Sequence, residues 1–270
     1  MTRFLVVPQW QGSPAARAML LVDGAEAIAG DLPRSRCERI EVPVEAGESL
    51  GTGIHRFSTL ERVREAIAAA LAATDEPVVV VGGDCGVAVP TIAHAAARES
   101  DLAVLWFDAH GDLNDPASSP SGAFAGMALR AVFTELPLAG TGLVPVERVL
   151  LAGAREFDDA ESLTIAEAGL RTLTANDVAD AEAIAEAVAA TGATAVHIHV
   201  DLDVLDPAVM TGVSLPVPFG VEVAQLTAAI AAVRARVPLA GASLTGFAPA
   251  SPASAVDDLG AILRIVGALA

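Results

Sequence analysis

The stretch Leu102-Ala-Val-Leu-Trp-Phe-Asp-Ala-His-Gly-Asp112 decides the fold and indicates where a ligand would bind. Its first six residues are apolar without interruption, which is typical of a strand buried on both faces of a parallel sheet. Asp108, His110 and Asp112 follow at alternate positions, so their side chains face one side while the backbone stays extended. An apolar strand that ends in three polar groups predicts a site at the carboxyl end of that strand.

Outward from this stretch, β-branched runs alternate with alanine-rich segments of helical period, the pattern of a parallel sheet covered by helices on both faces. We expect eight strands, roughly at 4–10, 38–44, 77–84, 102–110, 147–155, 171–175, 195–203 and 239–247. Helices are expected near 15–28, 59–73, 87–99, 177–190, 221–236 and 256–269. The sequence thus predicts an α/β fold in one domain over residues 1–270: a three-layer α/β/α sandwich around an eight-stranded parallel sheet.

The composition excludes several classes of function. A formal charge of −18 over 270 residues repels nucleic acids and anionic membranes, so we expect no nucleic-acid partner and no membrane partner. The chain has no lysine, which excludes a Schiff-base lysine and a phosphate-loop lysine. Neither a membrane helix nor a signal-peptide layout is visible, and two cysteines cannot form a disulfide framework. We therefore expect a cytoplasmic protein.

Three polar clusters directly follow predicted strands: Gly82-Gly83-Asp84-Cys85, residues 108–112, and Asp201-Leu202-Asp203. Ligands bind at that edge of open parallel sheets, so the clusters should converge on one site. Buried carboxylates there would repel one another unless cations compensate them. Oxygen-rich ligation with one imidazole suits Mn²⁺ or a similar ion, and paired ions are common in hydrolases. Two alternatives remain open. Each aspartate could instead cap a helix or form a turn. The cluster could also belong to a mononuclear or magnesium-type phosphohydrolase.

In order and spacing, these segments resemble the three signature motifs of the ureohydrolase family, which includes arginase, agmatinase and formiminoglutamase. The motifs are Gly82-Gly83-Asp84, residues 108–114 and residues 201–207 (DLDVLDP). The resemblance covers most of the chain and implies an arginase-like fold with two divalent metal ions. It implies that Asp108 and Asp201 bridge the metals, that Asp112 serves the first, and that His110 and Asp203 serve the second. It also implies that Asp112 accepts and passes a proton.

The chain departs from the family pattern at three positions. Cys85 stands where the remaining ligand is normally a histidine, and a thiolate shifts affinity from manganese toward zinc, iron or cobalt. The alternative is that Cys85 is a small buried residue with no bond to metal. Ala125 falls at a catalytic histidine of the family, and Gly246 at the glutamate that binds the guanidinium. The lost carboxylate should cost a cationic guanidinium several kcal/mol of binding.

The opposite end of the expected pocket keeps the family's groups for an amino acid. By resemblance, the α-carboxylate is recognised by Asn114, Ser119 and Ser121, and the α-amino group by Asp158 and Glu161. The alternative is that the first three are ordinary turn residues and that the two acids cap the following helix.

His199 alternates with Asp201 and Asp203 along one predicted strand, so the three should share a face. We expect His199 to lie beside the metals and to replace part of the proton transfer lost at Ala125. A core histidine is the alternative.

Together these features predict a metal-dependent amidinohydrolase acting on a small guanidino amino acid. The departures resemble the N-omega-hydroxy-L-arginine amidinohydrolase branch, which releases hydroxyurea and ornithine; a hydroxyguanidine is less basic and can bind neutral. The main rival is a non-catalytic arginase-like binding or regulatory protein with a degenerate metal site. A deacetylase-like amide hydrolase would need a tyrosine, which the chain lacks. Family members often form trimers or hexamers, so a homo-oligomer is compatible with the resemblance.

Overall fold

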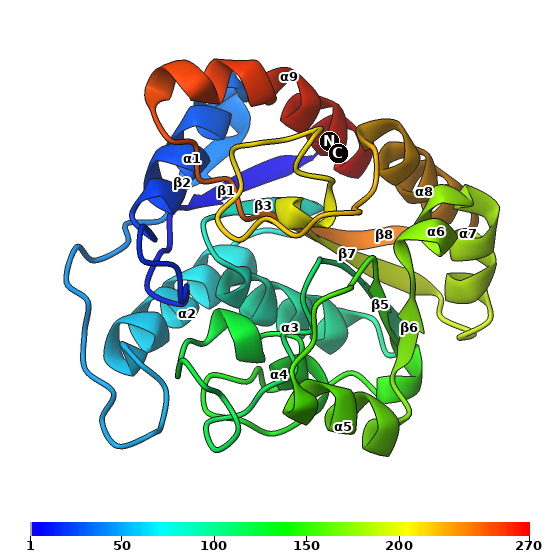
Figure 1. Cartoon of the computed structure of the whole chain (residues 1–270), viewed down its shortest axis with the longest axis horizontal. Helices are drawn as coiled ribbons and strands as arrows, with labels where there is room; N and C mark the ends of the chain where they lie inside the picture. Colours follow the sequence, from blue (N-terminus) through cyan, green and yellow to red (C-terminus); the bar gives the residue numbers. More distant parts are fainter. Residues whose placement is uncertain (1) are drawn as a thin grey trace.

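The structure, a computed structural model, describes residues 2–270 and is built on one eight-stranded sheet (Figure 1). The strand order is β2-β1-β3-β8-β7-β4-β5-β6, and every neighbouring pair is parallel. The strands are β1 (Arg3–Val7), β2 (Cys37–Arg39), β3 (Val78–Gly82), β4 (Leu102–Phe107), β5 (Val149–Ala152), β6 (Arg171–Leu173), β7 (Ala195–Asp201) and β8 (Leu239–Thr245). Each lies within one of the eight predicted segments or begins one residue before it, so the predicted fold class is confirmed.

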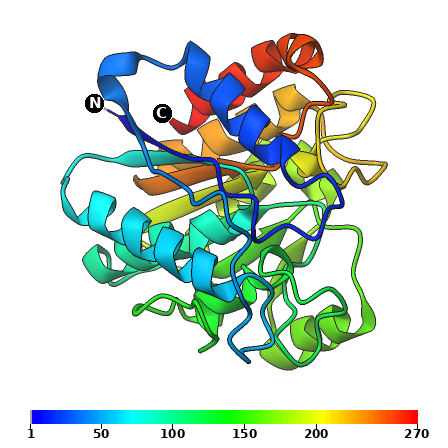
Figure 2. The same ribbon diagram turned by 90° about the vertical axis from the view of Figure 1, so that its left-hand side faces the viewer.

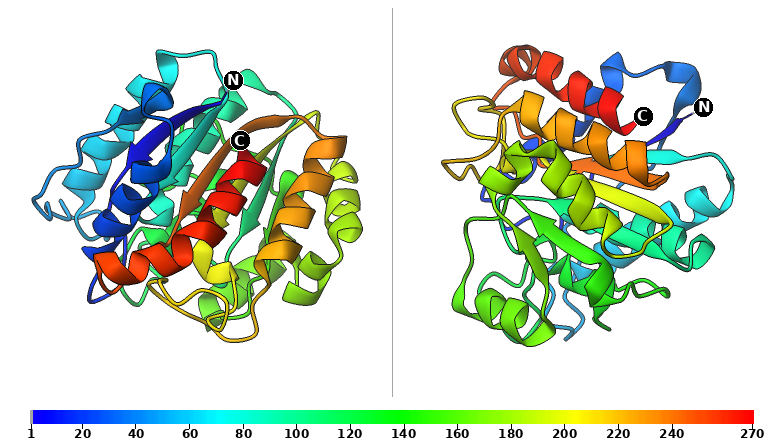
Figure 3. Two further views of the ribbon diagram at one scale, coloured as in Figure 1. Left: turned by 90° about the horizontal axis from the view of Figure 1, so that it is seen from above. Right: turned by 90° about the vertical axis from the view of Figure 1, so that its right-hand side faces the viewer.

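Helices cover both faces of the sheet (Figures 1 and 3). On one face lie α1 (Leu20–Asp31), α6 (Ala175–Ala179), α7 (Ala181–Ala189), α8 (Val223–Arg236) and α9 (Pro252–Leu269). On the other lie α2 (Phe57–Ala72), α3 (Ala88–Arg98) and the short α4 (Arg130–Phe133). Strands β3, β4 and β7 are buried along their whole length, because helices pack on both sides of them.

Besides the short α4, which was not predicted, two helical features differ from the prediction. The helix expected over 177–190 is split into α6 and α7, because the Asp180 side chain accepts hydrogen bonds from two backbone N–H groups and starts a new helix there. Helix α5 (Asp159–Ala168) was not predicted, because only one of its residues is buried and it has almost no apolar face. It depends instead on a capping box at its start and on Gly169, whose φ of 65° ends it.

The topology brings the functional segments together. Strands β3, β8, β7 and β4 are consecutive in the sheet, and they run in one direction, so their carboxyl ends meet at one edge. The loops that follow the strands gather at that edge, and the two chain termini lie at the opposite edge (Figure 2). Within residues 2–270, no helix has both the length and the apolar character needed to cross a membrane.

Candidate metal centre

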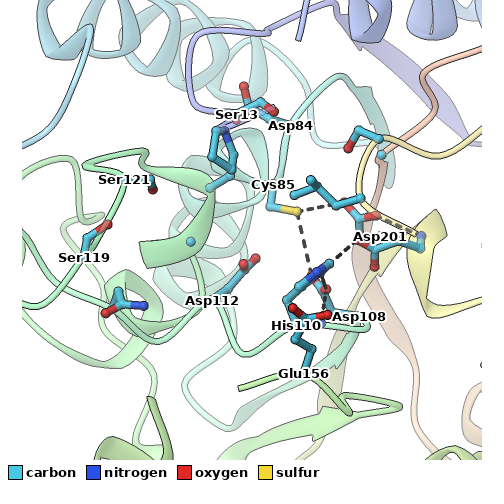
Figure 4. A pocket seen from close by; sticks show the side chains of 18 of the residues that line it. Ser13, Asp84, Cys85, Asp108, His110, Asp112, Ser119, Ser121, Glu156 and Asp201 are labelled. Atoms are coloured by element: carbon cyan, nitrogen blue, oxygen red, sulfur yellow. Dashed lines mark hydrogen bonds and ion pairs between the residues drawn. The ribbon is translucent and has the colours of Figure 1, made fainter. Parts of the chain in front are cut away.

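A pocket of about 310 Å³ opens at the carboxyl edge of the sheet. Figure 4 shows that acidic side chains, one thiol and one imidazole surround it from the ends of β3, β4 and β7. Of the site residues predicted from the sequence, all but His199 line its wall: Cys85, Asp108, His110, Asp112, Asn114, Ser119, Ser121, Asp158, Glu161, Asp201 and Asp203. The three sequence clusters therefore converge on one pocket, as expected.

One side of the centre is formed by His110 between two carboxylates. Its Nδ1 lies 3.0 Å from Oδ2 of Asp203 and 3.4 Å from Oδ1 of Asp108. Both carboxylates are also held by backbone donors: Ala109 N–H to Asp203 at 3.0 Å and His110 N–H to Asp108 at 2.8 Å. Burial alone would lower the pKa of His110, but its hydrogen bonds with the two carboxylates raise it to about 12. His110 thus bridges the carboxylates of Asp108 and Asp203.

The other side is formed by Cys85 and Asp201. The Cys85 Sγ lies 3.0 Å from Oδ2 of Asp201 and 3.9 Å from Oδ2 of Asp108 (Figure 4). Burial raises the pKa of the Cys85 thiol well above its usual range, and the neighbouring carboxylates raise it further. The Thr245 hydroxyl donates to Asp201 at 3.0 Å. Cys85 therefore donates its S–H to the Asp201 carboxylate in this structure.

Asp112 is a buried carboxylate whose Oδ2 receives no hydrogen bond. Its backbone has a φ of 54°, which turns the carboxylate into the cluster, and the side chain is almost fully buried. Its Oδ2 has no hydrogen-bond partner, and among residues 2–270 only the Nδ1 of His197 is in the same state. Burial raises the pKa of Asp112 well above its usual range, and repulsion from Asp108 adds to the effect. A buried carboxylate oxygen without a donor is what a cation ligand looks like before the cation is bound.

The donor set fits two divalent ions. In two groups of side chains, all ligand atoms lie within 4.8 Å of one another: Cys85, Asp108 and His199, and Asp108, His110 and Asp203. Asp108 belongs to both groups, as a bridging ligand would. Within residues 2–270, Asp112 and Asp201 belong to neither group, although both face the same pocket.

His199 lies beneath the pocket rather than on its wall. It is fully buried, and its ring packs on the Trp106 indole with 3.8 Å between ring centroids. Its Nδ1 lies 2.8 Å from the Ser243 hydroxyl, because β7 and β8 pair with these two residues opposite each other. Burial lowers the pKa of His199 to about 3, so the ring is neutral.

The residues predicted to hold the amino-acid end occupy one wall of the pocket. Asn114 donates to Asp158 at 2.8 Å and accepts from Ser118 at 2.8 Å, so its amide is held in one orientation. Ser119 and Ser121 accept from the backbone N–H groups of the loop at 3.0 Å and 3.2 Å, which leaves both hydroxyl hydrogens available to a ligand.

Asp158 and Glu161 also form the capping box that starts α5. Asp158 accepts from the Glu161 N–H at 2.8 Å, and Glu161 accepts from the Asp158 N–H at 3.0 Å. Burial raises the pKa of Glu161. The capping role that the sequence left open is therefore present, and both carboxylates still line the pocket.

Besides Cys85, the two other positions that depart from the family pattern also line the pocket. Ala125 begins a short 3-10 turn, and Gly246 has a φ of 88° just after β8. A Cβ atom at Gly246 would lie 2.1 Å from Oδ1 of Asp201, so the chain in this conformation leaves no room for any side chain there.

Sequence reasoning did not single out two residues that shape the site. Asp84 is buried and accepts from Gln9 and from the backbone N–H groups of Gly12 and Gly86, which fixes the N-terminal loop against the pocket. The Arg155 guanidinium donates to several backbone carbonyls, including those of Asp203 and Val217. Asp84 lies within a quoted motif, which was a usable signal, whereas nothing in the sequence marks Arg155.

Comparisons with known proteins agree with this architecture. The model of the arginase family matches residues 21–263. The arginase of Bacillus caldovelox is 34% identical over 207 residues, which are 70% of this chain and 66% of that protein. The matched segments thus span less than two thirds of the length of these curated relatives. For the arginase of Staphylococcus aureus (strain MRSA252), the match covers 59% of that protein.

Solved structures share the fold over the whole chain. Entamoeba histolytica arginase in complex with L-ornithine superposes with a TM-score of 0.86 at 21% identity, covering 99% of this chain and 97% of that one. Bacillus caldovelox arginase gives 0.81 at 25% identity, with 98% of both chains covered. Because the family model extends over nearly the entire sequence and the fold is that of solved arginases, this chain belongs to the arginase family.

Proposed function

We propose that this protein is a metal-dependent ureohydrolase that cleaves a guanidino C–N bond of an arginine-like amino acid. One observation carries the proposal: Asp112, whose buried Oδ2 lacks any donor, faces the pocket together with Asp108, Asp201 and Asp203. Such a concentration of buried carboxylates is tolerable in a folded protein when cations neutralise it. Membership of the arginase family supports the same reaction class.

Different residues of the pocket would bind the metal ions, transfer a proton and hold the substrate. Cys85, Asp108, His110, Asp112, Asp201 and Asp203 would hold the metal ions. When bound, two divalent ions activate water for attack on the guanidino carbon. Asp112 would accept a proton and pass it to the leaving amino group, since its carboxylate faces the pocket. Donors and acceptors at the opposite wall fix the substrate so that its guanidino carbon lies over the acidic centre.

The substrate end of the pocket favours an amino acid over a decarboxylated amine. The free hydroxyl hydrogens of Ser119 and Ser121 can donate to an α-carboxylate, and Asp158 can accept from an α-amino group. Products would then be ornithine with urea or hydroxyurea.

The guanidino end favours a group that binds without a positive charge. No carboxylate can project from Gly246, because its Cβ position is occupied by Asp201. N-omega-hydroxy-L-arginine meets this condition, since its hydroxyguanidine is less basic than the guanidine of arginine.

Manganese is the expected metal, because most of the donors are oxygen atoms. Zinc, iron or cobalt could also bind, because the Cys85 sulfur is a softer ligand. We expect the enzyme to act in the cytoplasm, where a homo-oligomer is compatible with its family.

The rival function is a binding or regulatory protein that has lost turnover. The absence of functional side chains at Ala125 and Gly246 favours it. The two functions differ in metal content, since an enzyme of this kind needs two ions per chain and the rival needs one or none.

The test combines metal analysis with product release. The metal-supplemented protein is assayed for urea and hydroxyurea from arginine, hydroxyarginine, agmatine and guanidinobutyrate, with Asp203→Asn as the inactive control. We expect two ions per chain and preferred turnover of hydroxyarginine. Turnover only of substrates without an α-carboxylate would overturn the assignment of Asn114 and Ser121. No product from any substrate, with fewer than two ions bound, would support the rival.

A further inference from the structure

The nitrogen ligand that is missing at position 85 has a replacement on β7, which is separated from β3 by β8 in the sheet. We propose that Nε2 of His199 and Sγ of Cys85, together with the Asp108 carboxylate, form the first metal position of the centre, and that this position selects zinc over manganese. The proposal deepens the two-metal function above and rests on it.

The three ligand atoms have the spacing that a small cation requires. They lie within 4.8 Å of one another, and the side chains are buried. In a tetrahedral zinc site, bond lengths of about 2.0–2.3 Å place ligand atoms roughly 3.3–3.8 Å apart. Within this set, the Cys85 Sγ lies 3.9 Å from Oδ2 of Asp108, which is close to that spacing.

The His199 ring is held so that Nε2 faces this space. Its Nδ1 is engaged with the Ser243 hydroxyl at 2.8 Å, whereas Nε2 has only a 3.5 Å contact with the Thr245 hydroxyl. The Thr245 hydrogen is directed to Asp201 at 3.0 Å, so it does not serve Nε2. Metal-bound histidines usually hold an outer partner with the ring nitrogen that does not face the metal, and the contact of Nδ1 with Ser243 fits that arrangement.

Trp106 couples two of the proposed ligands. Its indole ring stacks on His199 with an interplanar angle of 35°, and its Nε1–H donates to Oδ2 of Asp108 at 3.1 Å. The same side chain therefore fixes the His199 ring and one oxygen of Asp108. Rigid support of this kind keeps ligands in place when the metal leaves.

The two metal positions would differ in chemical character. The second position offers oxygen atoms of Asp108 and Asp203 and the His110 nitrogen, a set that suits manganese. The first offers sulfur, nitrogen and oxygen, a set typical of zinc and also accepted by cobalt. The structure thus points to a mixed-metal centre in a fold with two adjacent sites.

The test compares two histidines of the same strand. His197 and His199 are both fully buried, and both contact the Ser243 hydroxyl, at 3.3 Å and 2.8 Å respectively. His197→Gln is therefore a matched control for His199→Gln. Zinc affinity is measured by competition with a chromophoric chelator, and Co²⁺ loading is followed by absorption, where cysteine ligation gives a sulfur-to-cobalt charge-transfer band. Circular dichroism confirms that each variant is folded.

We expect His199→Gln to weaken zinc binding at one of two sites by at least about tenfold, and to alter the cobalt ligand-field bands. His197→Gln should bind zinc as the unmodified protein does, and Cys85→Ser should lose the charge-transfer band. A crystal structure of the zinc-loaded protein gives an independent answer that holds even if a variant fails to fold: Nε2 of His199 should lie about 2.0–2.1 Å from the metal.

Three results would overturn the proposal. One is zinc bound with Nε2 of His199 outside ligand distance. Another is equal zinc affinity in His199→Gln and His197→Gln. The third is unchanged metal binding in His199→Gln with a changed pH profile of turnover, which would assign His199 to proton transfer instead. Each leaves the two-metal function intact, whereas failure to bind any metal would remove the function and this inference together.

Discussion

A side chain at Gly246 and the Asp201 carboxylate would occupy the same space, because a Cβ atom at position 246 lies 2.1 Å from Oδ1 of Asp201. The glycine also has a φ of 88°, a conformation that L-residues rarely adopt. The lost glutamate of the family pattern is therefore coupled to the position of a predicted metal ligand. Reintroducing it would change the metal centre as well as the substrate pocket.

We predict that Gly246→Glu will not create an arginine hydrolase. It should displace Asp201, lower metal occupancy below two ions per chain, and destabilise the protein by ~1–3 kcal/mol through backbone strain. Metal analysis and urea denaturation check this. Gly267→Ala is the control: it lies in α9 with open space at its Cβ, so it should stabilise the protein by about 0.5–1 kcal/mol. Full metal occupancy with arginine turnover in Gly246→Glu would contradict the prediction.

Asp112→Asn should separate stability from metal binding. It removes a buried carboxylate whose pKa is raised by burial and by Asp108, so the metal-free protein should unfold at a higher urea concentration at neutral pH. Metal affinity should fall by ~10–100-fold. Asp257→Asn, on the exposed side of α9, should change neither quantity measurably. Equal or lower stability of metal-free Asp112→Asn would argue against electrostatic strain in the centre.

Asp84 makes stability depend on pH in the acid range. Burial raises its pKa to about 6 from 3.8, partly offset by hydrogen bonds from Gln9 and Gly12. A carboxyl with a raised folded pKa binds protons more tightly in the folded state, so the free energy of unfolding falls as pH rises from about 4 to about 6, by about 3 kcal/mol.

Comparing Asp84→Asn with the unmodified protein isolates this effect. Urea unfolding in the presence of a chelator, at steps between pH 4 and pH 7, should show a smaller fall of stability in the variant. Other buried carboxylates titrate equally in both proteins, so they cancel in the difference. Parallel pH curves would show that Asp84 is not the group responsible.

Ser121→Ala tests the amino-acid end of the pocket. If its hydroxyl donates to the substrate carboxylate, the loss of one charge-assisted hydrogen bond of about 1.5–3 kcal/mol should raise KM for hydroxyarginine or arginine by ~10–100-fold. KM for agmatine, which has no carboxylate, should not change. Steady-state kinetics on both substrates decide the matter, and an equal rise for both would mean that Ser121 only shapes the loop.

Arg155→Ala should loosen the loop that follows β7. The guanidinium donates to the carbonyls of Asp203 at 2.9 Å, Val217 at 2.7 Å and Pro218 at 2.9 Å. Without it, these half-buried acceptors lose a charged donor, and we expect a loss of ~2–4 kcal/mol of stability and weaker metal binding at Asp203. Arg148→Ala, which removes a more exposed pair with Asp101, should cost under about 1 kcal/mol. Similar losses in both variants would refute a special role for Arg155.

Much of the molecule could be predicted from local pattern. The apolar run ending at Phe107 predicted a buried parallel strand, and β3 was predicted in the same way, because burial on both faces leaves uninterrupted apolar segments. The edge strands β2 and β6 are short and partly exposed. Helix α5 escaped prediction, since its stability depends on the Asp158 and Glu161 capping box rather than on an apolar face. Arg155 escaped too, because its acceptors are backbone carbonyls distant in sequence.

The sequence by itself determined the fold class, the edge of the sheet at which the site lies, and the acidic residues that meet there, because the direction of parallel strands orders their carboxyl ends. Only the tertiary structure decided which atoms face one another: the free Oδ2 of Asp112, the approach of Gly246 to Asp201, and the orientation of His199 behind Cys85. These depend on strand register and on side-chain rotation across β3, β4, β7 and β8. The periodicity of the sequence cannot predict such contacts between side chains on separate strands.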